Sequence, residues 1–219
     1  VWINPGTTAT LLADTFTGNA ARGTASDNGG GGFFNNGGDA TFNAVLFSGN
    51  RTFDDGVPGG GLLAAGGTTL VEKSLFTGNY ASDGGALASI NGATVDVQNS
   101  TLYGNTARFG GGGFSASGSI TFDSATIASN SASIAGGGLY NQNTQNAGDP
   151  FVELTNTIVA GNTATNGTDL RGRHGSNGWN VIGTSPDAIT FPALGSDQTG
   201  TDPLLGPLQD NGGATFTAA

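Results

Sequence analysis

A repeat runs through most of the chain and constrains its fold more than any other feature. Each copy has an apolar residue, two further residues and then an asparagine. The asparagines are Asn19, Asn50, Asn79, Asn105, Asn130 and Asn162, at spacings of 31, 29, 26, 25 and 32 residues. A second landmark, a glycine run that ends in an apolar residue, recurs at Phe33, Leu62, Leu87, Phe114 and Leu139, with a degraded copy at Leu170. Periods of this length are typical of stacked repeat proteins.

The copies, aligned on the asparagine, show the alternation of a β-strand. The eighth residue before the asparagine is apolar in every copy, namely Leu11, Phe42, Val71, Val97, Phe122 and Leu154. The residues on either side of it are mostly polar, as in Thr41 and Asn43. An apolar position between two polar ones indicates a strand with one buried face, and it is not helical spacing.

Period and alternation together predict an all-β fold, a single-stranded right-handed parallel β-helix of about six to seven coils with no significant α-helix. A leucine-rich repeat fold is excluded because its leucine spacing is absent, and a propeller is excluded because each blade needs roughly 40 residues. Successive coils of a β-helix stack about 4.8 Å apart, so the apolar columns become inner ladders. The six asparagines then form a ladder whose amides bond along the stack.

We expect the coils to occupy residues 1–175 of one domain. Residues 176–219 hold a last strand, over 179–183, and a tail that packs on the solenoid. Pro186, Pro192, Pro203 and Pro207 punctuate that tail, and proline at this density disfavours further coils.

Composition excludes several classes of partner. Six basic residues against 16 acidic ones give a formal net charge of −10. Nucleic acid binding requires a basic stripe, which this chain lacks. No apolar run approaches the roughly 20 residues that span a bilayer, so no membrane insertion by this segment is expected. The absence of cysteine excludes disulfide bonds and thiolate metal sites.

The two landmarks resemble the repeat of chlamydial-type polymorphic outer-membrane proteins, which pairs GGA[ILV] with FxxN. Phe16–Asn19, Phe47–Asn50 and Phe76–Asn79 match the second motif, and 84–87 match the first. The stretches 180–183 and 202–213 resemble the end of bacterial "choice-of-anchor Q" surface proteins. These resemblances imply a bacterial extracellular or cell-surface β-helix from a longer or processed precursor. The GSPAID-type segment of that family is not present before Ala219, which puts a complete C-terminal cap in doubt.

The corner that follows the asparagine ladder is the leading candidate for a binding site. Stacking brings together on it three of the five arginines, an aromatic pair and several aspartates: Arg22, Asp27, Arg51, Asp54, Asp55, Tyr80, Asp83, Arg108 and Phe109. Arginine and aromatic side chains are enriched at contact sites, so we predict a groove for a glycan or a surface protein. The alternative is a solvated corner whose charges of both signs contribute little.

A polysaccharide lyase or hydrolase is the second hypothesis, and it rests on carboxylates predicted to share an outer strand face. They are Glu72, Asp96, Asp123 and Glu153. Glycosidases need two carboxyl groups roughly 5 Å or 6.5–9.5 Å apart. Lys73 is the one basic residue adjacent to them, and we expect it on the opposite face. The sequence assigns no catalytic residue.

The third hypothesis is a self-assembling filament or surface-layer subunit, because a solenoid without polar caps exposes strand edges that can pair end to end. No cofactor is predicted, although Asp27–Asn28 and Asp54–Asp55 carry the charge to bind Ca²⁺. His174 has no acid, nucleophile or metal partner in the sequence, and we expect it in a turn near the last coil.

Overall fold

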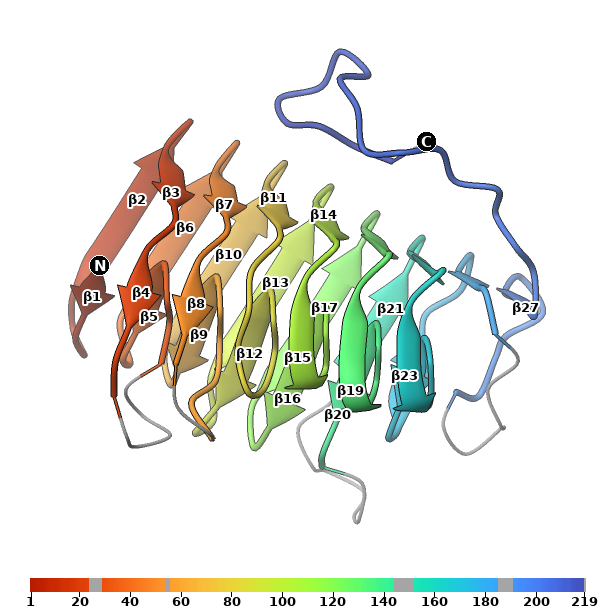
Figure 1. Cartoon of the computed structure of the whole chain (residues 1–219), viewed down its shortest axis with the longest axis horizontal. Helices are drawn as coiled ribbons and strands as arrows, with labels where there is room; N and C mark the ends of the chain where they lie inside the picture. The colour runs from red at the N-terminus through yellow and green to blue at the C-terminus, as the bar shows by residue number, and fades with distance from the viewer. Residues whose placement is uncertain (24–28, 54–55, 144–151, 185–190, 219) are drawn as a thin grey trace.

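A computed structural model describes residues 1–23, 29–53, 56–143, 152–184 and 191–218. All regular structure in these ranges is β-strand, without a helix. The strands run parallel within sheets in which neighbours come from successive repeats (Figure 1). The predicted all-β fold of stacked parallel strands is therefore confirmed, and the arrangement is consistent with a parallel β-helix.

Three long sheets carry the stack. The first sheet contains β1 (Trp2–Ile3), β5 (Phe33–Asn35), β9 (Leu62–Ala65), β12 (Leu87–Ile90), β16 (Gly113–Ala116), β20 (Leu139–Asn141) and β24 (Leu170–Arg171). The second contains β2 (Thr8–Leu12), β6 (Asp39–Asn43), β10 (Thr68–Glu72), β13 (Thr94–Gln98), β17 (Ser119–Asp123), β21 (Val152–Thr155) and β25 (His174–Ser176). The third contains β3 (Thr15–Thr17), β7 (Leu46–Ser48), β11 (Leu75–Thr77), β14 (Thr101–Tyr103), β18 (Thr126–Ala128), β22 (Ile158–Ala160), β26 (Val181–Ile182) and β27 (Gln198–Thr199).

Shorter strands follow the asparagines. One pair is β4 (Ala20–Ala21) with β8 (Arg51–Thr52), and a three-stranded sheet holds β15 (Thr106–Phe109), β19 (Ser131–Ala135) and β23 (Thr163–Asn166). These strands form the corner on which the sequence places its candidate binding residues.

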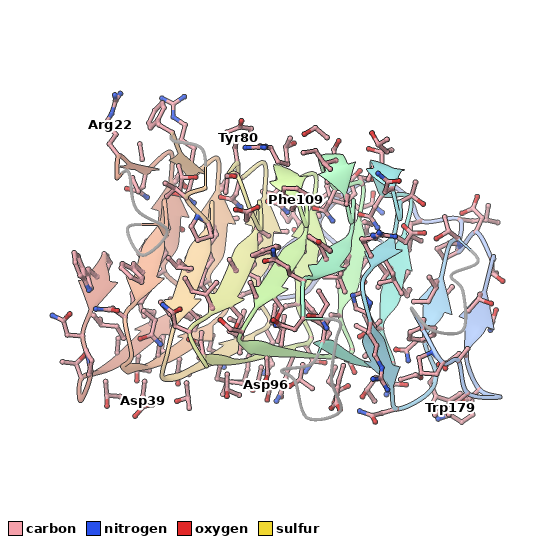
Figure 2. The ribbon with its side chains drawn as sticks, turned by 90° about the horizontal axis from the view of Figure 1, so that it is seen from below. Arg22, Asp39, Tyr80, Asp96, Phe109 and Trp179 are labelled. Atoms are coloured by element: carbon pink, nitrogen blue, oxygen red, sulfur yellow. The ribbon has the colours of Figure 1, made fainter. Side chains whose placement is uncertain are left out.

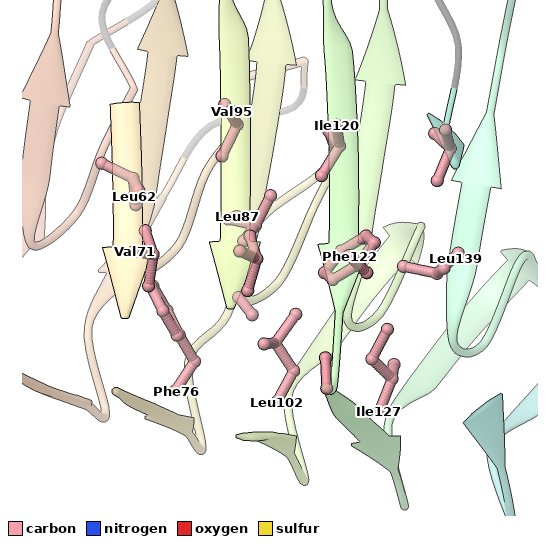
Figure 3. Close-up of a cluster of buried hydrophobic side chains, with 14 of the residues drawn as sticks. Leu62, Val71, Phe76, Leu87, Val95, Leu102, Ile120, Phe122, Ile127 and Leu139 are labelled. Carbon is pink, nitrogen blue, oxygen red and sulfur yellow. The ribbon is translucent and has the colours of Figure 1, made fainter. Parts of the chain in front are cut away.

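The repeat columns pair in register. Leu11, Phe42, Val71, Val97, Phe122 and Leu154 lie opposite one another from strand to strand of the second sheet. Phe47 stacks between Phe16 and Phe76, with ring centroids 5.0 and 4.4 Å apart. All of these side chains belong to a single core cluster except the partly buried Leu11, which packs against it. Figure 3 shows part of this cluster, with Val71, Phe76 and Phe122. Full burial of such a side chain contributes about 1.5–3 kcal/mol.

The structure corrects one landmark. In the first sheet, Gly113 pairs with Leu87 and Leu139, so Gly113, and not Phe114, is equivalent to the residues that end the neighbouring glycine runs. Phe114 instead pairs with Ala88 and Tyr140 on the outer face. A Cβ on Gly113 would lie 2.9 Å from Leu139 Cδ2 and 3.6 Å from the Phe122 ring. The large Phe122 and its leucine neighbours therefore take the space that a side chain here would need.

The glycine runs have two roles. Gly110, the first of its run, has φ of +64°, a conformation that glycine adopts readily because it has no Cβ. Its neighbour Gly111 packs so closely on the next coil that a Cβ would lie 2.4 Å from the carbonyl oxygen of Gly137. Glycine is thus required by backbone-to-backbone contact as well as by conformation.

The predicted asparagine ladder is present. Each Nδ2 group from Asn19 to Asn130 donates to Oδ1 of the next asparagine at 2.9–3.0 Å. The backbone N–H of the same residue donates to that same oxygen. From Asn50 onward, Nδ2 also donates back to a carbonyl of the preceding coil, such as Phe47 O for Asn79. Because every rung donates in the same direction, the ladder is polar.

Aspartates accept from Asn162, the last residue of the asparagine ladder, and from Asn180 at a second corner. Asn162 has no further asparagine to bond, and Oδ1 of the buried Asp169 accepts from its backbone N–H and its Nδ2 at 3.2 and 2.9 Å. At a second corner Thr157 N–H donates to Asn180 Oδ1, and Asn180 N–H donates to Asp197 Oδ1 at 2.9 Å. A carboxylate suits such a position because charge-assisted hydrogen bonds are stronger than neutral ones.

Two residues near the C-terminal end of the stack are buried. Phe191 is 2% exposed and belongs to the same core cluster as Ile182. His174 is fully buried in β25, opposite Val152, with its Nδ1 3.0 Å from Gly172 O. The expectation of a turn residue is wrong, because the ring occupies an inward strand position in the last rung of the second sheet.

The tail returns along the outer face of the third sheet (Figure 1). A cleft of about 340 Å³ separates residues 202–207 from β14, β18 and β22, and another of about 460 Å³ lies between Phe216 and the strands β3, β7 and β11. Thr215 Oγ1 donates to Lys73 O at 3.2 Å. Residues near the C-terminus therefore lie beside early coils.

The ladder predicts a strong dependence on position. Asn79→Ala removes the acceptor of the Asn50 amide and leaves buried groups on both neighbouring coils without partners. We expect it to lower the free energy of unfolding by about 3 kcal/mol or more, since each such loss costs about 1–3 kcal/mol. Asn19→Ala, at the exposed first rung, should cost about 1 kcal/mol. Urea denaturation of both variants measures the difference, and equal losses would contradict the ladder's role.

Asp197 gives a pH-dependent prediction. Burial raises the pKa of this carboxyl group. Hydrogen bonds from Ser176, Asn180 and Leu194 together lower it by more than burial raises it, so the pKa of Asp197 lies below the ordinary value of 3.8. At low pH the carboxyl group of Asp197 therefore takes up a proton more readily in the unfolded chain than in the folded one. Its contribution to stability is present above the pKa of the unfolded chain and is lost as pH falls through the pKa of the folded chain.

We expect Asp197→Asn to reduce the loss of stability between about pH 5 and pH 3, measured by urea denaturation at each pH. Asp14→Asn makes the same change of charge at an exposed position near the other end and is the control. If both variants showed the same pH profile, the assignment of a stabilising carboxylate to Asp197 would be wrong.

Candidate functional site at the arginine–aromatic corner

Four exposed side chains gather where the chain leaves the asparagine ladder. We define the arginine–aromatic corner as Arg22, Arg51, Phe53 and Tyr80, all of which are exposed. In β8 the side chain of Thr52 is buried, so the alternation of the strand directs Arg51 outward. Arg51 pairs with Ala20 on one side and forms a parallel bridge with Tyr80 on the other. Ladder geometry therefore fixes the spacing of these residues.

Both arginines contact the same aromatic ring. The guanidinium carbons of Arg22 and Arg51 lie 4.3 and 4.2 Å from the centroid of the Phe53 ring. Cation–π contacts of this kind contribute about 0.5–1 kcal/mol at exposed sites and hold the guanidinium groups in place. Arginine keeps its five N–H donors in a fixed plane. The corner thus presents oriented donors beside the half-exposed ring of Tyr80.

Phe53 was missing from the residues chosen by sequence. A signal for it exists, because it stands two residues after Arg51 and a strand places such residues on the same face. The long side chain of Arg22 then reaches the same ring from the preceding coil.

The remaining predicted residues form a second group on the same edge. Asp83 bridges to Phe109, and Arg108 Cζ lies 6.0 Å from the Phe109 ring centroid. Phe109 stacks on Tyr140, with centroids 5.5 Å apart. Figure 2 shows Arg22, Tyr80 and Phe109 along one long edge and Asp39, Asp96 and Trp179 along the opposite one. Asp27, Asp54 and Asp55 lie outside the described residues, as do the suggested calcium positions.

Beneath this second group lies an apolar cluster that the sequence analysis did not identify. Outward-facing residues of the first sheet form it: Phe34, Leu63, Ala65, Ala88, Ile90 and Phe114, with Phe109, Ala116 and Tyr140 packed against them. The signal was the second apolar residue after several glycine runs, as in Phe33–Phe34 and Leu62–Leu63. Phe109 is therefore partly buried against this cluster and only partly available at the surface.

The four carboxylates of the enzyme hypothesis are staggered on the outer face of the second sheet. Gln98 separates Glu72 from Asp123 in one column, and Thr121 separates Asp96 from Glu153 in the other. Diagonal neighbours in a sheet lie about 7–8 Å apart, which is close to the inverting range.

Two of these carboxylates accept hydrogen bonds from neutral side-chain amides. Asp96 Oδ2 accepts from Gln98 Nε2 at 2.6 Å, and Glu72 Oε2 accepts from Asn43 Nδ2 at 3.2 Å. Neither column holds an arginine or lysine in the described strands. The spacing of the carboxylates is therefore the one feature of these strands that supports the lyase or hydrolase hypothesis, because no arginine or lysine stands beside them.

Metal sites and membrane-spanning helices are both absent from the described ranges. No group of three or more His, Asp or Glu side chains there is arranged to hold a metal ion. Nor do those ranges contain a helix long and apolar enough to cross a membrane.

Comparison with known proteins adds no relative. No protein-family model, curated protein or solved structure matches the chain.

Proposed function

We propose that this chain is a right-handed parallel β-helix of six to seven coils that serves as a non-catalytic, extracellular or cell-surface binding scaffold. Right-handedness follows the strong preference of parallel strand crossovers. The extracellular setting follows the resemblance to polymorphic outer-membrane and choice-of-anchor Q proteins. The arginine–aromatic corner is the contact surface, and its first partner class is a glycan, with a surface protein as the alternative.

The observation that carries the proposal is the pair of guanidinium groups on the Phe53 ring. The chain has five arginines and a net charge of −10, yet two arginines are held together at one exposed ring. Arg22 and Arg51 are exposed, so their N–H donors can bond the hydroxyl or carboxylate oxygens of a sugar chain, and Tyr80 offers a ring for stacking.

The rigid rungs make this surface suitable for a polymer. Successive coils repeat about every 4.8 Å. Arg51 and Tyr80 lie in register on neighbouring rungs, and Arg22 lies on the preceding rung, two residues beyond Ala20, which pairs with Arg51. A ligand that runs along the solenoid meets all three without a change in the protein. Preorganised donors reduce the entropy lost on binding.

The test is a glycan array followed by titration of each hit against variants. Arg51→Gln with Tyr80→Ser should weaken binding at least tenfold, which corresponds to about 1.4 kcal/mol. The matched control is Arg171→Gln with Trp179→Ser, which removes the same two kinds of exposed side chain far from the corner.

Equal affinity of both double variants would remove the corner as the binding site. Release of reducing ends or unsaturated products from any polysaccharide by the unmodified chain would replace the scaffold by the enzyme hypothesis.

A further inference from the structure

The cleft of about 460 Å³ between the tail and the third sheet has apolar side chains on both walls. The sheet contributes Leu46 of β7 and Leu75 of β11, and the tail contributes Leu208 and Phe216. In β7 the buried Phe47 faces the core, so the alternation of the strand directs Leu46 outward. Phe216 is 50% exposed. The walls thus present apolar surface to a space that they do not fill, and its volume is typical of small-molecule sites.

Hydrogen bonds hold both walls of this cleft in place. The sheet wall belongs to the parallel ladder of β3, β7 and β11. On the tail side, Gln209 and Thr217 exchange backbone hydrogen bonds at 3.1 and 3.0 Å, and Asn211 Nδ2 donates to Thr217 O at 3.1 Å. The contact of Thr215 Oγ1 with Lys73 O joins the two walls. A cleft with walls already in place loses less entropy when a ligand binds.

One carboxylate gives the cleft a polar end. Asp14 is the one charged residue among the described residues that line the cleft, and it is exposed. Asp14 O accepts from Leu46 N–H at 3.0 Å, so this residue lies directly beside the apolar wall. Lys73 meets the tail through its carbonyl oxygen and is not part of the lining. Together with the net charge of −10, Asp14 makes the cleft attractive to a cation.

We propose that this cleft binds a small organic amine, with its ammonium group at Asp14 and its apolar ring or chain between Leu46 and Phe216. A charge-assisted hydrogen bond to the carboxylate orients the ligand. Burial of the apolar part between the two walls supplies the favourable free energy of binding. An organic anion would meet the carboxylate of Asp14 instead of a base. The site shares no residue with the arginine–aromatic corner, so it does not depend on glycan binding.

Two fluorescent dyes with the same dansyl ring test the proposal on the unmodified chain at neutral pH. Dansylcadaverine carries an ammonium group, and dansylglycine carries a carboxylate. Dansyl fluorescence rises in apolar surroundings, so titration gives the dissociation constant of each dye. We expect saturable binding of one dansylcadaverine molecule per chain, about tenfold or more tighter than the binding of dansylglycine.

Two pairs of variants locate the dye. Phe216→Ser removes part of one apolar wall and should weaken dansylcadaverine binding by about fivefold or more. Its control is Leu204→Ser, which removes an exposed apolar side chain of the same tail outside the cleft and should leave binding unchanged. Asp14→Asn should remove most of the preference for dansylcadaverine over dansylglycine. Asp39→Asn, at an exposed position of the second sheet, should keep that preference.

All four positions are exposed, so the variants should fold, which circular dichroism checks. The proposal is overturned if the unmodified chain shows no saturable binding of dansylcadaverine, or if Phe216→Ser and Leu204→Ser have equal effects. Equal affinities of the unmodified chain for the two dyes, or equal preferences of Asp14→Asn and Asp39→Asn, would overturn the assignment of an amine.

Discussion

The hydrogen bond from one asparagine side chain to the next is the interaction on which the rest of the structure depends. Each Oδ1 from Asn50 to Asn162 accepts two donors from the coil before it. These hydrogen bonds fix the position of the corner, while the number of residues between two asparagines can vary. Spacings from 25 to 32 residues therefore occur in one stack. Buried amides without partners would be costly, which holds the coils in register.

Because the ladder has a direction, its two ends need different chemistry. Donors are left over at the C-terminal end, where Asp169 and Asp197 accept them. Asp169 also accepts from Thr184 N–H through its second oxygen at 2.8 Å, so one carboxylate ties the ladder to the start of the tail.

The sequence predicted the core well because burial repeats with the period of the coil. Phe47 and Val71 were placed correctly by counting from an asparagine. The landmark at Phe114 is one residue out of register with its neighbours, because the equivalent residue is Gly113, which carries no apolar signal. His174 was assigned to a turn because a polar ring inside the last rung has no counterpart in earlier copies.

The candidate site was predicted in part. The pairing of Arg51 with Tyr80 follows from ladder position, which the repeat defines. The position in the repeat does not predict which residues a long side chain contacts, so the packing of Arg22 and Arg51 on Phe53 was not predicted. Phe109 was assigned to the surface although it stacks on Tyr140, because packing outside the core leaves a weaker pattern in the sequence than packing inside it.

Stacking in register is the central claim, and engineered disulfides measure it most directly. Leu70 and Asp96 are neighbours in one outward column of the second sheet, where adjacent strands lie about 4.8 Å apart. Leu70→Cys with Asp96→Cys should form a disulfide on oxidation. Leu70→Cys with Thr121→Cys, two rungs or about 9.6 Å apart, should stay reduced. A bond in the second pair and none in the first would contradict the account.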